Sequence, residues 1–418
     1  MKLTMLGAGR EVGKSAIMIE SDKKIVMDYG MKINDPSDLE TRQPAYPIEK
    51  EVNAAIISHA HLDHCGGLPA LFRKKKMPAF MTDVSLELTS MLIKDSIKIA
   101  QRNKYTLPFG KHELKRMIES TKFVNYREKF VASGFSCELF NAGHIPGSSG
   151  IMLRKENKEI FYTGDIQTLE SNLLTSCMLP KKADILIMES TYAFKNHPER
   201  KKEIKKFKES VEECIASGTQ ALIPVFAVGR SQEMIMMLEE YADIIALDGM
   251  AKLACEIVSN YSAKIKDAKR FRRVLDKVKI IKDKDERQHA MMKFPIIVAT
   301  SGMLTGGPTV HYLRHIKDNP DNKVIFSGFL IPGTPGRKLM ETGSFDNGEE
   351  KYKVKCRVEQ FDLSAHTDRK GLFKIIEDLK PKTVVAVHGD NCEAFAKDIE
   401  KEFYIEAIAP RNGETIRL

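Results

Sequence analysis

The sequence predicts an α/β protein with two domains, one of which contains a parallel sheet covered by helices. With 418 residues, the chain is longer than a typical single hydrophobic core. Between residues 191 and 352, predicted helices and strands alternate, which is the pattern of βαβ units. Outside that segment short apolar strands dominate, and several of them end in a histidine or an acidic residue.

The composition is that of a globular protein, with 42% hydrophobic and 29% charged residues. We find no apolar run long enough to cross a bilayer and no signal-peptide core at the start, so we expect a cytoplasmic protein without membrane contact. The seven cysteines are scattered and form no CxxC pair. This favours reduced, buried thiols over a disulfide framework or a cysteine-ligated zinc.

The net charge of +9 is concentrated in three basic runs, at residues 73–76, 200–208 and 264–284. Such runs are often only solvated faces. Three of them beside a metal site favour a polyanionic partner such as nucleic acid.

The first 30 residues predict three strands, of which the third ends at Asp28. The intervening loop GAGREVGKS imitates a phosphate-binding loop, but Ala8 stands where that motif needs glycine, and a strand follows in place of a helix. We therefore exclude a nucleotide site there.

The remaining elements follow from periodicity and turn residues. We expect surface helices near residues 68–76, 83–103 and 112–121, then strands near 138–140, 156–165 and 181–190. In the alternating segment we expect helices at 202–217, 230–241, 250–261 and from 308. Strands are expected at 219–226, 243–247, 294–300 and 323–329. After residue 352 the pattern found before residue 191 returns, and a helix is expected at 370–379.

Chemically reactive residues recur directly after predicted strands, where a rigid sheet would hold them while loops carry the chemistry. They are Asp28, His59, Asp165, Glu189, His366 and His388.

The segment HAHLDH contains the densest group of candidate metal ligands. In an extended chain, residues two apart point the same way, so His59, His61 and Asp63 would converge while His64 faces elsewhere. With residues further along, the segment completes a two-metal set. His59, His61 and His144 would hold one ion, Asp63, His64 and His388 the other, and Asp165 would bridge them.

Imidazole and carboxylate ligands favour two Zn²⁺ per chain and leave manganese open. Two such ions share a water, lower its pKa and clamp the oxygens of a phosphoryl group. Asp28 would lie one shell out and orient a ligand histidine or the HAHLDH loop.

These motifs resemble the β-CASP family of metallo-β-lactamase-fold nucleases. HAHLDHCGGLP, His144, Asp165 and Asp28 resemble the metallo-β-lactamase motifs. Glu189 in MESTY, His366 in DLSAHTD and His388 in VHGD resemble the three added β-CASP motifs. The likeness covers essentially the whole chain and lies near short archaeal proteins similar to the cleavage-and-polyadenylation-factor endonuclease, with ribonuclease J related.

The resemblance implies a metallo-β-lactamase αββα sandwich made of residues 1–190 and 353–418, with residues 191–352 inserted as a Rossmann-like β-CASP cap. It also implies a zinc-dependent ribonuclease that hydrolyses single-stranded RNA, as an endonuclease, a 5′–3′ exonuclease or both. In that role His366 would be the general acid, Glu189 would hold its ring, and Asp63 and Asp165 would complete the catalytic set.

Partners implied by the resemblance are single-stranded RNA, a second copy of the chain and proteins of RNA processing or decay. Two alternatives remain: a non-catalytic RNA-binding scaffold of a 3′-end processing complex, and a small-molecule metallo-hydrolase. All ligands are present, which disfavours the scaffold, and the insert and the basic runs disfavour a compact substrate.

Candidate substrate contacts lie in the cap and just after it. The glycine-rich segment 300–308, with Ser301 and Gly302, would open a helix and hold a phosphate, or form a plain tight turn. Arg230 would reach a substrate phosphate or pair with Glu233, and Ser364 is a further candidate. Cys65 is expected to fill the core beside the metal site and not to bind metal.

Overall fold

The computed structural model describes residues 1–32 and 52–418, and these fold into two compact units. The first unit comprises Met1–Glu170, Thr175–Asn196 and His366–Leu418, and the second comprises Ser171–Leu174 and His197–Ala365. Each unit has its own sheets and its own core.

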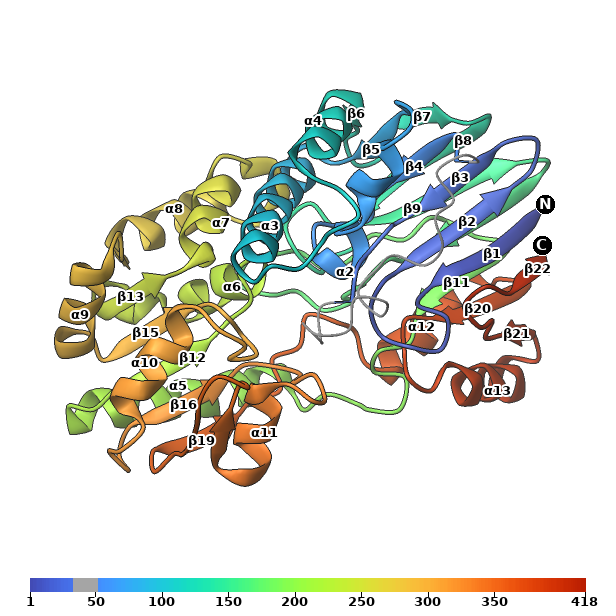
Figure 1. Cartoon of the computed structure of the whole chain (residues 1–418). Coiled ribbons are helices and arrows are strands. Elements are labelled where there is room, and N and C mark those ends of the chain that lie inside the picture. The colour runs from blue at the N-terminus through green and yellow to red at the C-terminus, as the bar shows by residue number, and fades with distance from the viewer. Residues whose placement is uncertain (33–51) are drawn as a thin grey trace. The chain divides into compact units, whose positions relative to one another are not determined.

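The first unit contains two seven-stranded sheets (Figure 1). The first sheet has the order β22 (Thr415–Arg417), β1 (Lys2–Gly7), β2 (Ala16–Glu20), β3 (Lys24–Met27), β4 (Ala54–Ile56), β5 (Ala79–Met81) and β6 (Thr121–Phe123). The second sheet has the order β21 (Glu406–Ile408), β20 (Thr383–Val387), β11 (Ile185–Glu189), β10 (Lys158–Tyr162), β9 (Ser149–Lys155), β8 (Phe135–Asn141) and β7 (Lys129–Ala132).

Alternating side chains on these strands build three separate cores. On β3, Ile25 and Met27 face the layer between the sheets, whereas Val26 faces outward. On β11, Ile187 lies in the same inner layer and Leu186 faces outward. Because successive strand residues point to opposite faces, both sheets are apolar on both sides and need cover outside as well.

Helices supply that cover, so the unit is the expected αββα sandwich. The first sheet is covered by α3 (Asp83–Arg102) and α4 (Lys111–Ser120). The second is covered by α12 (Arg369–Leu379) and α13 (Cys392–Phe403). The predicted surface helix at 68–76 is wrong. That segment forms only a short 3-10 helix, η1 (Leu68–Phe72), and all five of its residues are buried because they pack into the core under α4.

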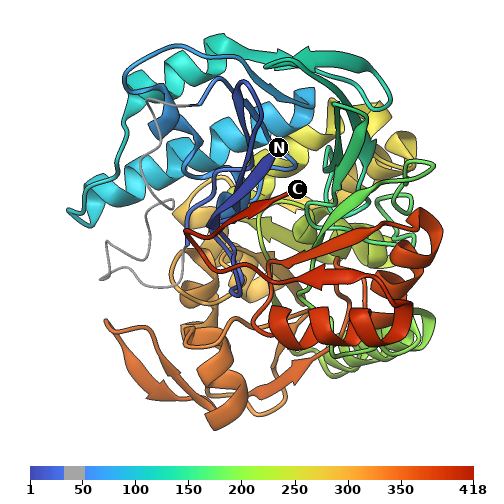
Figure 2. The ribbon, with the colours of Figure 1, turned by 90° about the vertical axis from the view of Figure 1, so that its right-hand side faces the viewer.

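The two ends of the chain meet in the first sheet. β22 pairs antiparallel with β1, so that Leu3 lies opposite Ile416, and the two termini lie next to each other (Figure 2). In the second sheet β20 pairs in parallel with β11. The C-terminal segment therefore completes both sheets.

The second unit is built on a six-stranded parallel sheet, as the alternating pattern predicted. Its order is β14 (Lys279–Ile280), β13 (Ile245–Asp248), β15 (Ile296–Ala299), β12 (Ala221–Pro224), β16 (Lys323–Phe326) and β19 (Arg357–Gln360). The four central strands are buried along their whole length, as is usual for a parallel sheet covered on both faces.

The connections between these strands are mainly helical. Helix α5 (Arg200–Ser217) precedes the first of them, β12. The connections contain α6 (Arg230–Met237), η2 (Glu239–Ile244), α7 (Met250–Ser259), η3 (Ser262–Lys264), α8 (Ala268–Lys277), α9 (Lys284–Lys293), α10 (Pro308–Ile316) and α11 (Pro335–Thr342), with a hairpin of β17 (Ser344–Asp346) and β18 (Lys351–Lys353).

The second unit extends beyond residue 352, where the sequence placed its end. β19 adds to the sheet beside β16, with Val324 opposite Val358, and the chain returns to the first unit at His366. Within the described ranges, no helix is long and apolar enough to span a bilayer.

Candidate metal centre

Three parallel strands of the second sheet bring functional residues to one edge. β10, β11 and β20 are neighbours that run in parallel, so their carboxyl ends meet. Glu189 is the last residue of β11 and His388 directly follows β20, as predicted, while Asp165 lies three residues beyond β10. His366 is different: the strand before it belongs to the second unit, and His366 lies in the loop before α12.

The HAHLDH segment enters from the first sheet. β4 ends at Ile56, and the chain turns through His61 into the four-residue helix α2 (Leu62–Cys65). The expectation of an extended segment is therefore wrong beyond His61. Because helical geometry replaces the two-residue alternation, Asp63 does not converge with His59 and His61 but groups with His64 and His388.

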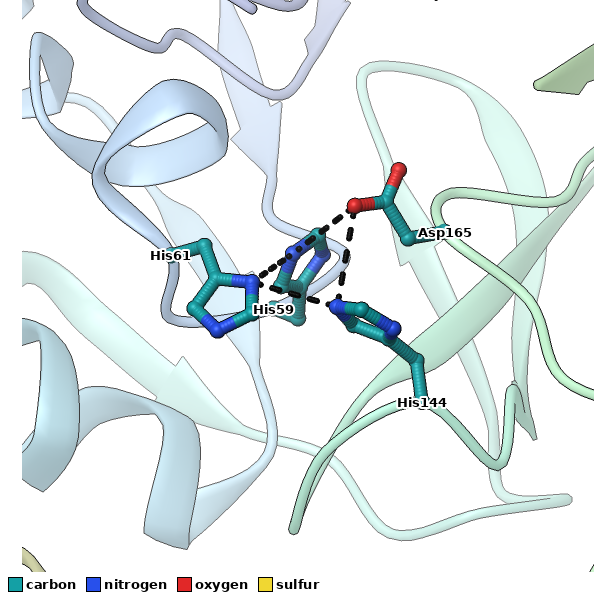
Figure 3. A group of neighbouring side chains, drawn as sticks. All are labelled: His59, His61, His144 and Asp165. Atoms are coloured by element: carbon teal, nitrogen blue, oxygen red, sulfur yellow. Dashed lines mark hydrogen bonds and ion pairs between the residues drawn. The ribbon is translucent and has the colours of Figure 1, made fainter. Parts of the chain in front are cut away.

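The first ligand group consists of His59, His61, His144 and Asp165, whose side chains point toward one another (Figure 3). Nδ1 of His61 lies 3.2 Å from Nε2 of His59 and 3.1 Å from Nε2 of His144. Oδ2 of Asp165 lies 3.5 Å from Nε2 of His59 and 3.6 Å from Nε2 of His144.

These distances fit a tetrahedral zinc ion. Ligand atoms about 2.0–2.1 Å from such an ion lie about 3.4 Å from one another, close to the observed range of 3.1–3.6 Å. Three imidazoles and one carboxylate are also the donor types that zinc prefers. The residues present thus fit the ion.

The second ligand group consists of Asp63, His64 and His388. Oδ2 of Asp63 lies 3.4 Å from Nε2 of His388 and 3.8 Å from Nε2 of His64. Asp63 is partly exposed, whereas both histidines are buried. The candidate ligand atoms lie farther apart in this group than in the first.

Asp165 lies between the two groups and presents one oxygen to each. Oδ2 faces His59 and His144, whereas Oδ1 lies 3.2 Å from His64 and 3.7 Å from His388. Oδ1 is buried and accepts no well-aligned hydrogen bond from the described part of the chain. A buried carboxylate oxygen normally has a partner, and a cation between the groups would supply one.

Asp28 contacts His64, one of the candidate ligands. Its Oδ2 lies 2.8 Å from Nδ1 of His64 and also accepts hydrogen bonds from the hydroxyls of Ser58 and Tyr162, at 2.7 and 2.8 Å. Its Oδ1 accepts from the backbone N–H of Ser58 at 2.6 Å. With Nδ1 occupied, Nε2 of His64 is directed toward Asp63 and Asp165.

His366 approaches the same centre without joining a ligand group. Its Nδ1 lies 3.0 Å from both carboxylate oxygens of Glu189, and its Nε2 lies 3.9 Å from Oδ2 of Asp165. Oε1 of Glu189 also accepts the backbone N–H of Ile166 at 2.8 Å. Glu189 is thereby fixed, and it fixes the ring in turn.

The electrostatics of the centre stabilise positive charge. Burial lowers the pKa of His64, but the carboxylates of Asp165 and Asp63 outweigh it and raise that pKa well above its ordinary value. Burial tends to raise the pKa of Asp165, but His64, His388 and His366 hold it well below its usual range. The pKa of His59 is well below normal, first because of burial and second because of His64. The shifts at Asp165 and His59 favour the ionised carboxylate and the neutral imidazole that bind metal, whereas His64 would release a proton on binding an ion.

The pKa of His366 also responds to opposing effects. Burial lowers it, but the charges of Glu189 and Asp165 raise it to about 9. The ring is therefore protonated near neutral pH.

The candidate substrate residues lie in the second unit. A helix does begin at the end of segment 300–308, at Pro308. Oγ of Ser301 is hydrogen-bonded to the hydroxyl of Thr305 and also accepts the backbone N–H of Thr305 at 3.0 Å. Arg230 donates to the carbonyl of Leu363 at 2.5 Å. The ion-pair partner of Glu233 is Arg200, at 3.3 Å.

Gly302, Ser364 and Cys65 were also singled out in the sequence, and each has defined contacts in the structure. Gly302 packs closely against the turn that follows β12. A Cβ added to Gly302 would lie 3.0 Å from the backbone N of Phe226. The carbonyl of Ser364 accepts from Arg200 at 3.0 Å. Cys65 lies in the core and donates to the carbonyl of Ala60 at 3.3 Å, as predicted.

Sequence reasoning missed the polar residues that support the ligands. Ser58 and Tyr162 bond Asp28, and Thr191 lies 3.2 Å from Nδ1 of His388. Ser58 immediately precedes the first ligand histidine, which is a usable signal. Nothing local marks Tyr162, because its contact is made across 134 positions.

Three family models together match most of the chain. Residues 231–339 match the model described as the Beta-Casp domain, and residues 351–410 match the Zn-dependent metallo-hydrolase RNA specificity domain. Residues 1–211 match a model described as Anti-Pycsar protein Apyc1.

Curated relatives match over the entire chain. "Probable RNase MJ4" of Methanocaldococcus jannaschii is 37% identical, with 100% of both chains covered. The chain belongs to the β-CASP family. RNase aCSPSF2 of Saccharolobus solfataricus is 34% identical over 100% of this chain and 85% of its own length.

Other β-CASP relatives carry a different name. Transcription termination factor FttA of Pyrococcus horikoshii is 33% identical over 100% of this chain and 71% of its own length. A solved structure, a protein of unknown function from Enterococcus faecalis, has a TM-score of 0.65 at 15% identity and covers 100% of this chain. That likeness supports the metallo-β-lactamase fold with its β-CASP insertion.

Proposed function

We propose that this β-CASP protein is a zinc-dependent ribonuclease that hydrolyses phosphodiester bonds of single-stranded RNA. The observation that carries the proposal is the position of Asp165 between two ligand groups, with Nε2 of His366 directed at the same carboxylate. The names of two relatives that match all of this chain, "Probable RNase MJ4" and RNase aCSPSF2, support the reaction class. An RNA specificity domain model matching residues 351–410 supports the substrate class.

The residues in the ligand groups would hold two ions. His59, His61 and His144 would hold one, Asp63, His64 and His388 would hold the other, and Asp165 would serve both. When bound, two zinc ions supply a water of lowered pKa and positive charge for the phosphoryl oxygens.

His366 acts as the general acid. The attacking water loses one proton to solvent as its oxygen joins phosphorus, the bond from phosphorus to the 3′ oxygen breaks, and the proton on Nε2 of His366 passes to that oxygen. Glu189 holds Nδ1 and favours the imidazolium form. The products carry a 5′-phosphate and a 3′-hydroxyl.

Residues of the second unit would bind the RNA backbone. Arg230, Ser301, Gly302 and Ser364 are the proposed contacts, and the net charge of +9 favours a polyanion in general. A homodimer and partners in RNA processing or decay belong to the same proposal. The relatives named transcription termination factors are consistent with an RNA substrate.

The test uses one RNA labelled separately at its 5′ and 3′ ends. Wild-type protein, Asp165→Ala and the exposed-site control Asp22→Ala are compared with and without a chelator. We expect cleavage by the wild type and the control that disappears in Asp165→Ala and with the chelator. Internal fragments identify an endonuclease, and single nucleotides released from the 5′ label identify an exonuclease.

The alternatives predict other outcomes. If the RNA is bound on a native gel but stays intact in every lane, the protein is an RNA-binding scaffold and not a ribonuclease. RNA that is neither bound nor cleaved, together with hydrolysis of a small phosphodiester, would favour a small-molecule hydrolase.

A further inference from the structure

The loop between β1 and β2 has an unusual backbone. It comprises residues 8–15, the segment whose sequence imitates a phosphate-binding loop. Ala8, Arg10 and Lys14 have φ angles of 61°, 59° and 43°, a left-handed conformation that residues other than glycine rarely adopt. Such conformations persist where the surrounding structure holds them, and they gather at functional sites. The loop contains no residue of the two ligand groups, so its shape points to a role of its own.

The loop is fastened to the second ligand group at both ends. The carbonyl of Ala8 accepts the backbone N–H of His388 at 2.9 Å. The backbone N–H of Ser15 donates to the carbonyl of Asp63 at 2.7 Å. Between these two points, a Cβ added to Gly13 would lie 3.8 Å from Cβ of Asp63. The loop therefore runs directly beside Asp63.

A second segment reaches the same place. Residues 29–32 run along α2, since the backbone N–H of Met31 donates to the carbonyl of Leu62 at 2.8 Å. Cγ of Lys32 lies 3.8 Å from the same Cβ position on Gly13. The stem of Lys32 and the side chain of Asp63 therefore both pack against this glycine.

Lys14 and Lys32 share one carboxylate. Nζ of Lys32 lies 2.8 Å from Oε2 of Glu11, and Nζ of Lys14 lies 3.2 Å from Oε1. Nδ2 of Asn412 donates to Oε1 at 2.5 Å and helps to fix the carboxylate. The two lysine side chains are 31% and 19% exposed. Two ammonium groups beside one carboxylate leave a net charge of +1 next to the second ligand group.

We propose that Lys14 and Lys32 bind a backbone phosphate of the RNA beside the second ligand group. A phosphate offers several oxygens, and each ammonium has three donors of which Glu11 needs only one. Because the strand β2 and not a helix follows the loop, side chains supply the donors in place of a helix N-terminus. Such a contact positions the strand at the metal centre and does not read its sequence. This inference rests on the proposed function and deepens it, because it names the groups that position the RNA on the first unit.

The test measures binding in a chain that cannot cleave. In the Asp165→Ala background, Lys14→Gln and Lys32→Gln are made singly and together. Affinity for a single-stranded RNA is measured by fluorescence anisotropy at several salt concentrations. The measurement is repeated with RNAs in which one phosphate at a time is replaced by an uncharged methylphosphonate.

The matched control is the double variant Lys76→Gln, Lys115→Gln in the same background. These two exposed lysines also share one carboxylate, that of Glu119, at 3.0 and 3.9 Å. The control therefore changes the net charge by the same amount and breaks the same kind of ion pair. It leaves the residues beside the second ligand group as they are.

We expect the Lys14, Lys32 double variant to lose roughly 10-fold in affinity for the RNA. The slope of log affinity against log salt concentration should become shallower by about 0.7, the value for one phosphate contact on a single strand. Methylphosphonate at one position of the RNA should weaken binding to the parent protein and to the control, but no longer to the double variant. Lys14→Arg with Lys32→Arg should keep the affinity, because the charge is kept.

Equal affinity and equal slopes in the double variant and the control would overturn the proposal. So would a double variant that remains sensitive to the same methylphosphonate, since its phosphate contact would then lie elsewhere. If the lysines only tie the loop to the fold, the glutamine variants lose affinity for every RNA equally and unfold at lower temperature, which also overturns it. Failure of the proposed function is separate, because it is the absence of chelator-sensitive cleavage by the unsubstituted protein.

Discussion

Both carboxylate oxygens of Glu189 lie 3.0 Å from Nδ1 of His366, on the side of the ring opposite the one that faces Asp165. The carboxylate is almost completely buried and is itself held by the backbone N–H of Ile166. A ring held in this way has its second nitrogen, Nε2, oriented toward the ligand groups. The pair thus has the geometry of a proton donor with a fixed direction.

His366→Ala should lower turnover by about 10²- to 10⁴-fold, the usual contribution of a general acid, while leaving the metal content unchanged. Turnover is measured on labelled RNA and zinc by elemental analysis of the purified protein. His112→Ala, at an exposed histidine on α4, is the matched control. A loss of zinc in His366→Ala would mean that His366 is a ligand.

Asp28→Asn should weaken metal binding by about 10- to 100-fold, because the group that orients a ligand histidine is lost. Asn keeps the shape but replaces one carboxylate oxygen by an amide that cannot accept from Ser58 and Tyr162. Competition with a zinc-binding dye gives the affinity. Tyr162→Phe removes only one of the donors to Asp28 and should have a smaller effect; an equal effect would place the role in Tyr162.

The strand-end residues were predictable because a parallel sheet gathers its carboxyl ends by construction. Glu189 and His388 occupy the expected places for that reason. The detailed grouping of Asp63 was not predictable, because whether HAHLDH continues as a strand or turns into a helix depends on what packs beneath it. Cys65, which ends that helix, is completely buried in the core under α3 and α4.

The residue at which the second domain ends could not be predicted from the sequence either. Arg357–Gln360 reads as a strand, but a strand pattern does not specify its partner. β19 joins the parallel sheet because β16 offers a free edge there. Register and partner are properties of the assembled sheet.

Asp248→Ala should destabilise the protein by about 3–5 kcal/mol, the usual cost of breaking a buried ion pair. The carboxylate is fully buried and accepts from Nε of Arg287 at 2.6 Å and from the hydroxyl of Tyr312 at 3.1 Å. Its loss leaves a guanidinium and a hydroxyl without their acceptor. Chemical unfolding followed by circular dichroism gives the change.

The matched control is Asp318→Ala, whose carboxylate is 62% exposed beside Lys317. An exposed ion pair contributes about 0–1 kcal/mol, so this variant should unfold almost as the wild type does. Similar losses in both variants would show that the Asp248 network has no special role in stability.

Cys65 should make stability fall as the pH rises above about 9. Burial raises the pKa of the Cys65 thiol to about 12, whereas in the unfolded chain it ionises near its ordinary value of about 8.5. Between these two values the unfolded state has lost the proton and the folded state retains it, so unfolding is favoured by about 1.4 kcal/mol per pH unit for this thiol.

Urea unfolding at pH 8, 9 and 10 gives the slope of stability against pH for the wild type and for Cys65→Ala, which lacks the thiol. The wild type should lose stability more steeply by that amount, and the native thiol should resist iodoacetamide until the chain unfolds. Equal slopes, or rapid alkylation of Cys65 in the folded protein, would mean that the thiol is accessible and ionised beside the metal centre.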